Sequence, residues 1–255
     1  MTIHSGVDIW TESGGRDGPT LVLLHGLGAN GAVWEGLKPL VDKHWPGRWL
    51  NLDLRGHGRS GHAGPYGYGS YAADVAAAIG GQDESVTVIG HSMGGVVAMA
   101  LATGWFGVSV DRVLAFGVKI AWADGEAARM KQIAAAPLRW FDTREEAVDR
   151  YLKVSGLIGL VDPASPEALT GIREENSRFA LASDPWINAA AGPEVAPFYR
   201  EARAPIRLAA SENDPMVAMA DMAVLDPDAV ILPGVGHNAH VERPDLVWEL
   251  FEETR

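Results

Sequence analysis

The pentapeptide Gly90-His91-Ser92-Met93-Gly94 constrains what this chain can fold into more than any other stretch. It follows a short, largely β-branched run at 85–89 and precedes a longer run rich in Ala, Met and Leu at 95–102. The first run predicts a buried strand and the second a buried helix. A Gly-x-Ser-x-Gly at such a junction is typical of a tight turn that holds the serine hydroxyl exposed. A glycine-rich loop that contains a serine by chance would show the same residues, so the rest of the chain must decide.

Composition excludes several classes of protein. Of the 255 residues, 47% are hydrophobic, which is enough for a substantial core. The formal net charge of −12 argues against a nucleic-acid partner and, unless basic residues cluster locally, against a polyanionic substrate. The chain has no cysteine, so disulfides and thiol chemistry are excluded. The first residues show no signal-peptide pattern and no apolar stretch reaches about 18 residues, so we expect a cytoplasmic protein with no membrane partner.

Short apolar runs alternate with segments of helical spacing on both sides of the pentapeptide. The runs predict strands at 7–11, 20–24, 48–52, 85–89, 112–116, 206–210 and 229–232. Helices are predicted between them, including one at 71–79 and a final one that starts at Pro244. This alternation predicts an α/β fold with a mostly parallel sheet, helices on both faces, and active residues on the loops at the carboxyl ends of the strands.

The alternation is lost between residues 119 and 200. This stretch holds several tryptophans, six prolines and helical segments, which predict a helical cap inserted into the fold rather than a second independent domain. The predicted organisation is therefore a core of residues 1–118 and 201–255 and an insert of residues 119–200. Most aromatic residues of the insert are expected to anchor its own helices, but Trp122 and Trp140 are candidates for lining a pocket that suits an apolar acyl or aryl group.

Three residues that could form a catalytic set each follow a different predicted strand. A serine hydroxyl is a poor nucleophile at neutral pH, and it needs a base to take its proton and a carboxylate to orient that base. Ser92, Asp214 and His237 supply these types in loops that directly follow strands. Because the carboxyl ends of parallel strands meet at one edge of a sheet, we expect the three side chains to lie together.

The chain resembles the α/β-hydrolase superfamily from about residue 6 to its C-terminus. It is most similar to the small cap-bearing branch of serine esterases, lactonases and C–C hydrolases. The matching stretches are 25–28 (HGLG), 53–60 (DLRGHGRS), 90–95 (GHSMGG), Asp214, and Gly236-His237 with Glu242 and Pro244.

The resemblance implies a sheet of the eight-stranded type and a role for each site residue. Ser92 would be the nucleophile, His237 the base and Asp214 the orienting acid. The main-chain amides of Leu27 and Met93 would form the oxyanion hole, and neither a metal nor an organic cofactor would be required.

Other histidines compete with His237 for the role of base. His237 precedes a Glu by five residues and a Pro by seven, the spacing of the resembled family, so it is favoured over His240. We expect His240 to be a surface or supporting residue, His91 to pack away from Ser92, and His25 and His57 to make structural hydrogen bonds in tight loops.

Other carboxylates compete with Asp214. Asp53 precedes the pentapeptide in the chain, so loop anchoring is the expected role. Glu212 is disfavoured because the family places the acid two or three residues before an apolar residue, here Val217. Some family members take the acid from the loop after the preceding strand, which keeps Asp124 as an alternative.

The resemblance implies hydrolysis of a carboxylic ester or lactone through an acyl-enzyme, with a small molecule as the partner. Three alternatives stay open: hydrolysis of a C–C bond in a diketone by the same three residues, a non-enzymatic receptor for a small ligand on the same fold, and an acyltransferase. The oligomeric state is not predicted.

Overall fold

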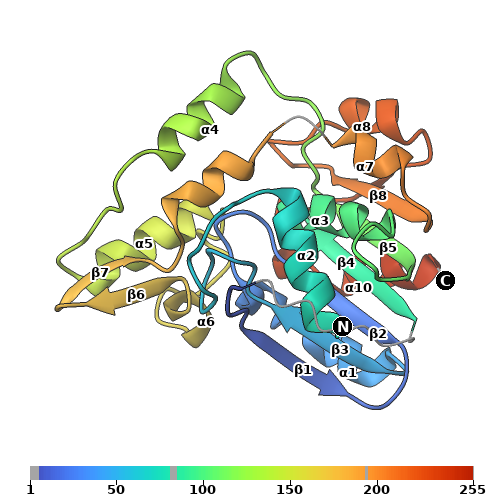
Figure 1. Ribbon diagram of the computed structural model, residues 1–255, viewed down its shortest axis with the longest axis horizontal. Helices are drawn as coiled ribbons and strands as arrows, with labels where there is room; N and C mark the ends of the chain where they lie inside the picture. The colour runs from blue at the N-terminus through green and yellow to red at the C-terminus, as the bar shows by residue number, and fades with distance from the viewer. Residues whose placement is uncertain (1–5, 81–84, 193–194, 255) are drawn as a thin grey trace.

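The computed structural model describes residues 6–80, 85–192 and 195–254. Its main sheet has seven strands in the order β1-β3-β2-β4-β5-β8-β9 (Figure 1). These are β1 (Thr11–Gly15), β2 (Thr20–Leu24), β3 (Arg48–Leu52), β4 (Val86–His91), β5 (Val110–Phe116), β8 (Ile206–Ser211) and β9 (Val230–Leu232). Only β1 runs antiparallel to its neighbour in this sheet. The predicted α/β class with a mostly parallel sheet is therefore confirmed.

The described sheet has one strand fewer than the eight-stranded type that the resemblance implies. Six of the seven predicted strands overlap observed strands over most of their length. The first is misplaced, because β1 is Thr11–Gly15 whereas the sequence predicts the strand at 7–11. The chain before Thr11 bonds to a glycine-rich loop instead. Trp10 N donates to Ser60 Oγ at 2.9 Å, and Asp8 O accepts from Gly61 N at 2.8 Å.

Successive residues of the central strands face opposite sides of the sheet. In β2, Val22 and Leu24 belong to the apolar core on one face, while Leu21 and Leu23 belong to the core on the other. All four side chains are fully buried. A strand that is apolar at every position is the signature of a sheet covered on both faces, and this is why the run at 20–24 shows no alternation.

Helices cover both faces of the sheet (Figure 1). The first core includes α2 (Tyr68–Ile79) and α3 (Met93–Ala102), together with α8 (Met219–Leu225). The second includes the short helix η1 (Gly31–Trp34), α1 (Lys38–His44) and α10 (Pro244–Glu253). None of the described helices is both long and apolar enough to cross a membrane.

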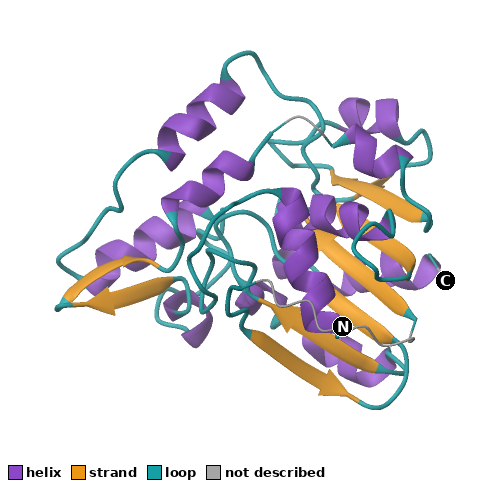
Figure 2. Ribbon diagram, in the orientation of Figure 1, coloured by secondary structure: helices purple, strands orange, loops and turns teal. Residues whose placement is uncertain are grey.

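Between β5 and β8 the chain leaves the main sheet (Figure 2). This stretch holds α4 (Glu126–Ala134), α5 (Arg144–Val154), α6 (Pro166–Leu169), the short helix η2 (Pro185–Ala190) and α7 (Ala196–Arg200). In Figure 1, α4 and α5 lie to one side of the sheet. The division of the chain into a core and a cap stays a prediction.

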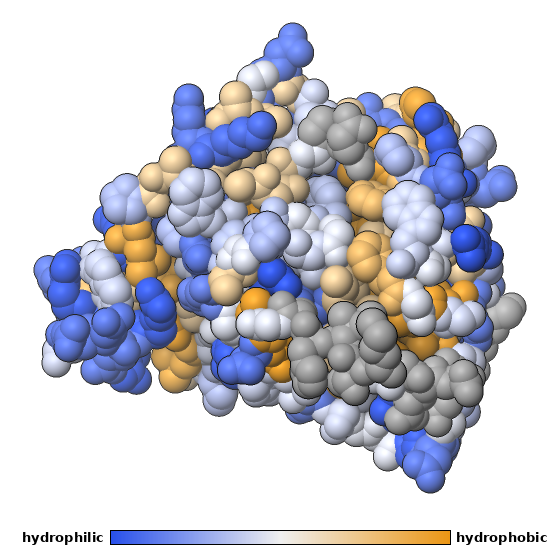
Figure 3. Space-filling model, viewed as in Figure 1, coloured by the Kyte–Doolittle hydropathy of each residue, from blue (hydrophilic) through white to orange (hydrophobic). Residues whose placement is uncertain are grey.

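The insert also contains two strands that are not predicted from the sequence: β6 (Ile172–Glu175) and β7 (Arg178–Leu181) form an antiparallel hairpin. Its two turn residues, Asn176 and Ser177, have φ of 51° and 60°. Positive φ at both positions matches the twist of a two-residue hairpin, and Asn tolerates this region. The turn contains no glycine and the flanking residues are charged, which hides the hairpin in the sequence. Hydrophilic side chains cover this end of the molecule (Figure 3).

Candidate active site

Ser92 lies at the sharp turn between β4 and α3. Its φ of 52° and ψ of −117° are a conformation that L-residues rarely adopt. The turn needs glycine because it leaves no room for a side chain: a Cβ on Gly90 would lie 2.5 Å from Gly94 O. Ser92 N donates to Phe116 O of β5 at 2.9 Å, which holds the turn against the neighbouring strand. The strained serine predicted from the pentapeptide is therefore observed.

Asp214 and His237 meet as the sequence predicts. Asp214 follows β8, His237 follows β9, and the Nδ1–H of His237 donates to Asp214 Oδ2 at 2.6 Å. The Asp214 side chain is fully shielded from solvent, whereas 14% of the His237 side chain is exposed. Met216 N donates to the other carboxylate oxygen, Asp214 Oδ1, at 2.8 Å. One oxygen is therefore fixed by the backbone and the other orients the imidazole.

The His237 ring lies at the same edge of the sheet as Ser92. A Cβ on Gly117 would lie 3.4 Å from His237 Cε1, and Gly117 follows Phe116, the residue that holds Ser92 N. Among the described contacts there is no hydrogen bond between Ser92 Oγ and His237. Such bonds are often long in ligand-free enzymes and shorten when substrate binds.

The loop after β2 passes beside the nucleophile. A Cβ on Gly26 would lie 3.2 Å from Ser92 Cβ. Within the described residues, the amides of Leu27 and Met93 donate to no acceptor of the chain, which leaves both amides available to a ligand. His25 fixes this loop: its Nδ1 donates to Gly26 O at 2.8 Å, and its Nε2 accepts from Leu54 N at 2.9 Å. The structural role expected for His25 is observed.

A cluster of buried rings lies behind His237. The His91 ring contacts the rings of His237 and His240 in tilted arrangements, with ring centroids 4.6 Å and 4.5 Å apart. Burial and the neighbouring histidines hold the pKa of His91 well below its usual range, and burial lowers the pKa of His240 to about 3. Both rings are therefore neutral near pH 7.

We expected His240 to be a surface or supporting residue, and a surface position is wrong. His240 is fully buried between His91, Trp34 and Phe116, and both of its ring nitrogens lack a hydrogen-bond partner among the described residues. His240 is the second residue of α9 (Ala239–Glu242), and this helix places its ring in the apolar core. His91 packs as expected, but it also contacts His237, which the sequence did not predict.

Asp53 anchors the glycine-rich loop, as expected. Its buried carboxylate accepts from Gly31 N at 2.7 Å, from Arg59 N at 2.8 Å and from the Arg59 guanidinium at 2.7 Å. Although burial alone would raise the pKa of Asp53, the Arg59 hydrogen bonds lower it. His57 is buried in the same loop and its Nδ1 donates to Arg55 O at 3.0 Å. This loop is held by its own polar contacts rather than left open for chemistry.

The two carboxylates that compete with Asp214 lie elsewhere. Glu212 is exposed and accepts from Gly234 N at 2.7 Å. Asp124 is exposed beside Lys119 in a hollow near the start of the insert. Neither contacts His237 in the part of the chain that the structure describes. The described residues also contain no group of three or more His, Asp or Glu side chains placed to hold a metal ion.

The predicted pocket residues have different surroundings. Lys119 Nζ lies 5.2 Å from the ring centroid of Trp122, whose Nε1 is buried without a partner among the described residues. Trp140 lies against the hairpin, with the Arg173 guanidinium 5.5 Å from its ring. No described contact joins either tryptophan to Ser92, so their lining of a pocket stays a prediction.

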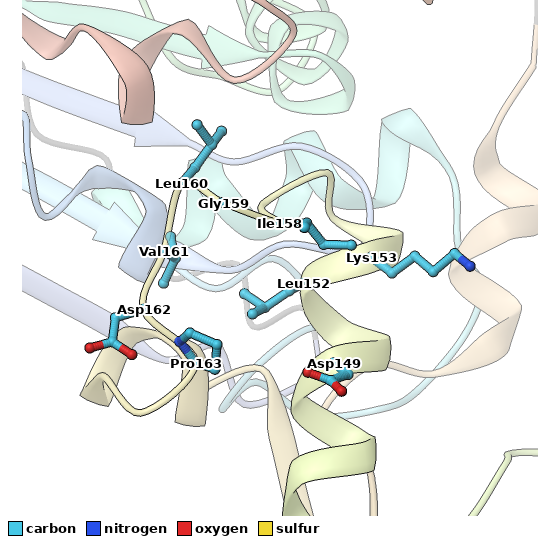
Figure 4. A pocket seen from close by; sticks show the side chains of 9 residues that line it. All are labelled: Asp149, Leu152, Lys153, Ile158, Gly159, Leu160, Val161, Asp162 and Pro163. Atoms are coloured by element: carbon cyan, nitrogen blue, oxygen red, sulfur yellow. The ribbon is translucent and has the colours of Figure 1, made fainter.

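A separate hollow lies within the insert, beside the C-terminal half of α5 (Figure 4). Its volume is about 600 Å³, and its wall is largely apolar. The lining includes Leu152, Ile158, Leu160 and Val161, with Lys153 pointing away to one side. None of the predicted site residues lines it.

The sequence-based predictions missed Asn238, which directly follows His237 and is buried. Its side-chain Nδ2 donates to Ser155 O at 3.1 Å and to Gly156 O at 3.0 Å, both at the end of α5. No motif marks this residue. Its position next to the predicted base was the one available signal.

Comparison with known proteins identifies the family of the chain. The model of the alpha/beta hydrolase family matches residues 21–250. Lipase LipV of Mycobacterium tuberculosis is 32% identical over 160 residues, which cover 62% of this chain and 58% of LipV. A pimeloyl-(acyl-carrier protein) methyl ester esterase of Aeromonas hydrophila is 44% identical over 86 residues, which cover 33% of this chain and 32% of that protein. The matched region thus spans less than two thirds of either relative.

The solved structure of a thioesterase domain from the curacin biosynthetic pathway superposes with a TM-score of 0.77. The superposition covers 98% of this chain and 97% of that one, at 18% sequence identity. At this identity the likeness establishes the fold alone. Because the family model covers most of the chain, the protein belongs to the alpha/beta hydrolase family.

Proposed function

We propose that the protein is a serine hydrolase that cleaves a carboxylic ester or lactone through an acyl-enzyme. The observation that carries the proposal is the 2.6 Å hydrogen bond from His237 to a buried Asp214, at the sheet edge where Ser92 is held in a strained turn. The names of LipV and of the methyl ester esterase, both of which denote ester cleavage, support an ester as the substrate.

In this proposal each group has one task. Ser92 Oγ attacks the carbonyl carbon while His237 Nε2 takes its proton, and Asp214 stabilises the imidazolium that forms. The amides of Leu27 and Met93 bind the oxyanion, and one such donor typically stabilises the transition state by about 3 kcal/mol. His237 then protonates the leaving alcohol, and afterwards it activates the water that releases the acid.

The position of the two amides favours this role. Leu27 follows Gly26, which approaches Ser92, and Met93 directly follows Ser92. Met93 is the first residue of α3, so its amide is one of the unpaired donors at the positive end of the helix. Negative charge that develops on the carbonyl oxygen is therefore stabilised by groups that are already in place. Only the backbone acts at these positions, so the side chains can serve in packing: Met93 is buried in the core and Leu27 packs against it.

Steady-state hydrolysis of a series of p-nitrophenyl esters, from acetate to octanoate, tests the proposal. The wild-type protein should turn over at least one member, and Ser92→Ala should lower kcat by a factor on the order of 10⁶. Saturable binding of the esters with no turnover would instead support the receptor alternative. Turnover of a vinylogous diketone in preference to every ester would support C–C hydrolysis.

A further inference from the structure

The C-terminal turn of α5, residues 151–156, contacts the two loops that carry the proposed catalytic groups; we call this turn the α5 end. The helix ends at Val154. Two residues later Gly156 adopts a φ of 70°, and Leu157 N donates to Leu152 O at 2.7 Å. This arrangement is typical of a glycine-capped helix terminus. The last carbonyl oxygens lie beyond the helical donors and carry the negative end of the helix dipole, so they favour an external hydrogen-bond donor.

Asn238 supplies that donor from the loop of the proposed base. Its Nδ2 bonds both Ser155 O and Gly156 O, at 3.1 Å and 3.0 Å. The two segments approach so closely that a Cβ on Gly156 would lie 3.0 Å from Asn238 Nδ2. Asn238 is the residue directly after His237, so the α5 end fixes the main chain to which the imidazole is attached.

The same turn contacts the loop of the proposed oxyanion hole. Asn30 Nδ2 donates to the Tyr151 hydroxyl at 3.3 Å, and a Cβ on Gly28 would lie 3.9 Å from Val154 O. Asn30 and Tyr151 are both buried. Both contacts lie in the three residues that follow Leu27, while Gly26, the residue before it, approaches Ser92. The α5 end therefore touches two loops that leave different strands, β2 and β9.

We propose that the α5 end positions His237 and the Leu27 amide together, with Asn238 and Tyr151 as the positioning residues. This inference rests on the proposed function. A misplacement of reacting groups by about 1 Å can cost about a hundredfold in rate, and two loops from separate strands have few constraints in common. The α5 end belongs to the insert and bonds to both loops. The relative position of His237 and the Leu27 amide therefore depends on how the insert packs against the core.

The test uses two readouts on the full chain. The first is kcat and KM for the best p-nitrophenyl ester. The second is the rate at which a fluorophosphonate labels Ser92, where Ser92 Oγ forms a bond to phosphorus, fluoride leaves and His237 takes the proton. Asn238→Ala should lower kcat and the labelling rate about tenfold or more, with KM within about threefold. Tyr151→Phe, which removes only a hydroxyl, should lower both rates about threefold. In the double variant, kcat and the labelling rate should fall by less than the product of the two single-variant factors, because both residues act through one turn.

Two matched variants serve as controls. Asn188→Ala removes an amide that bonds only Pro185 O within η2, at 2.8 Å. Tyr71→Phe removes a buried hydroxyl that has no hydrogen-bond partner among the described residues. Both should keep the wild-type kcat and labelling rate.

The failures of the two proposals are distinguishable. A wild-type protein that neither hydrolyses esters nor is labelled at Ser92 overturns the proposed function and this inference with it. A wild-type protein that is labelled, with folded Asn238→Ala and Tyr151→Phe labelled at the same rate, overturns only the positioning role. If Asn238→Ala does not fold, Tyr151→Phe decides alone.

Discussion

His91 Nε2 donates a hydrogen bond to the main-chain oxygen of His237 at 2.9 Å. A carbonyl oxygen can only accept, so this nitrogen carries the proton, and the ring is neutral with a lone pair on Nδ1. The bond joins the residue before the proposed nucleophile to the proposed base. The proposed mechanism needs a neutral ring here, because a charged His91 only 4.6 Å away would repel the imidazolium that His237 would become.

Removing this hydrogen bond should slow the reaction. His91→Phe keeps a ring in the stack but has no donor, and we expect kcat to fall about tenfold, the usual effect of losing one hydrogen bond that orients a group. His91→Gln, whose amide can reach the same oxygen, should recover most of the loss. Steady-state kinetics of both variants checks this. His240→Phe is the control and should keep the wild-type kcat, because His240 lies in the same ring cluster without a hydrogen bond among the described residues. Equal kcat values for His91→Phe and His91→Gln would contradict the prediction.

Asp214 rather than Asp124 should be the acid. Asp214→Asn removes the carboxylate that holds His237 in its tautomer, and by analogy with other catalytic triads kcat should fall by a factor on the order of 10⁴. Asp124→Asn changes an exposed side chain and should alter kcat less than twofold. Parallel measurement of kcat at one pH decides, and a larger loss in the Asp124 variant would move the acid to the insert.

Acid should destabilise the fold through its buried histidines. Burial lowers the pKa of His57 and of His240 to about 3, and it also lowers the pKa of His25 and His91. Below about pH 6.5 the unfolded chain binds a proton at each of these residues and the folded chain does not. The free energy of unfolding therefore falls as pH decreases from about 6.5 toward 3, and it is insensitive to these groups above that range.

The contribution of one histidine can be isolated. Each one makes the unfolding equilibrium constant rise about tenfold per pH unit of acidification within this window. His240→Leu removes a ring whose nitrogens lack partners among the described residues, so its unfolding free energy should depend less steeply on pH, with no loss at pH 7. Urea unfolding of the variant and the wild type at pH 5, 6 and 7 measures the slopes, and parallel slopes would refute the assignment.

The ion pair between Arg55 and Asp74 should be far more important for stability than a similar pair on the surface. Both side chains are buried, and two guanidinium nitrogens bond the carboxylate, one of them at 2.6 Å. Asp74→Ala leaves a buried cation unpaired, which typically costs 3–5 kcal/mol, about the stability of a marginal domain. The control is Asp245→Ala, which breaks a pair with Arg243 on the surface, where water screens the two charges and the loss of stability should be small. Denaturant unfolding compares them, and similar losses would contradict the burial argument.

Local patterns predicted most of the elements because each depends on neighbouring residues. Asn30 and Thr143 cap the helices that follow them, and Pro244 starts the last helix, as their residue types indicate. The hairpin at 172–181 was missed because it is stabilised by pairing with residues across the turn and by packing on α5, and its charged strands show no apolar alternation.

The sequence by itself determined the α/β class and the candidate set of Ser92, Asp214 and His237, because parallel strands bring their following loops to one edge whatever the lengths between them. Only the tertiary structure decided what surrounds that set. The burial of His240, the bond from His91 to the main chain of His237, and the seating of the α5 end on Asn238 join residues far apart in the chain. Such contacts depend on how whole elements pack, and no local spacing encodes them. Thus Gly90 to Gly94 predicted the proposed nucleophile, whereas the packing shows which distant groups contact the proposed base.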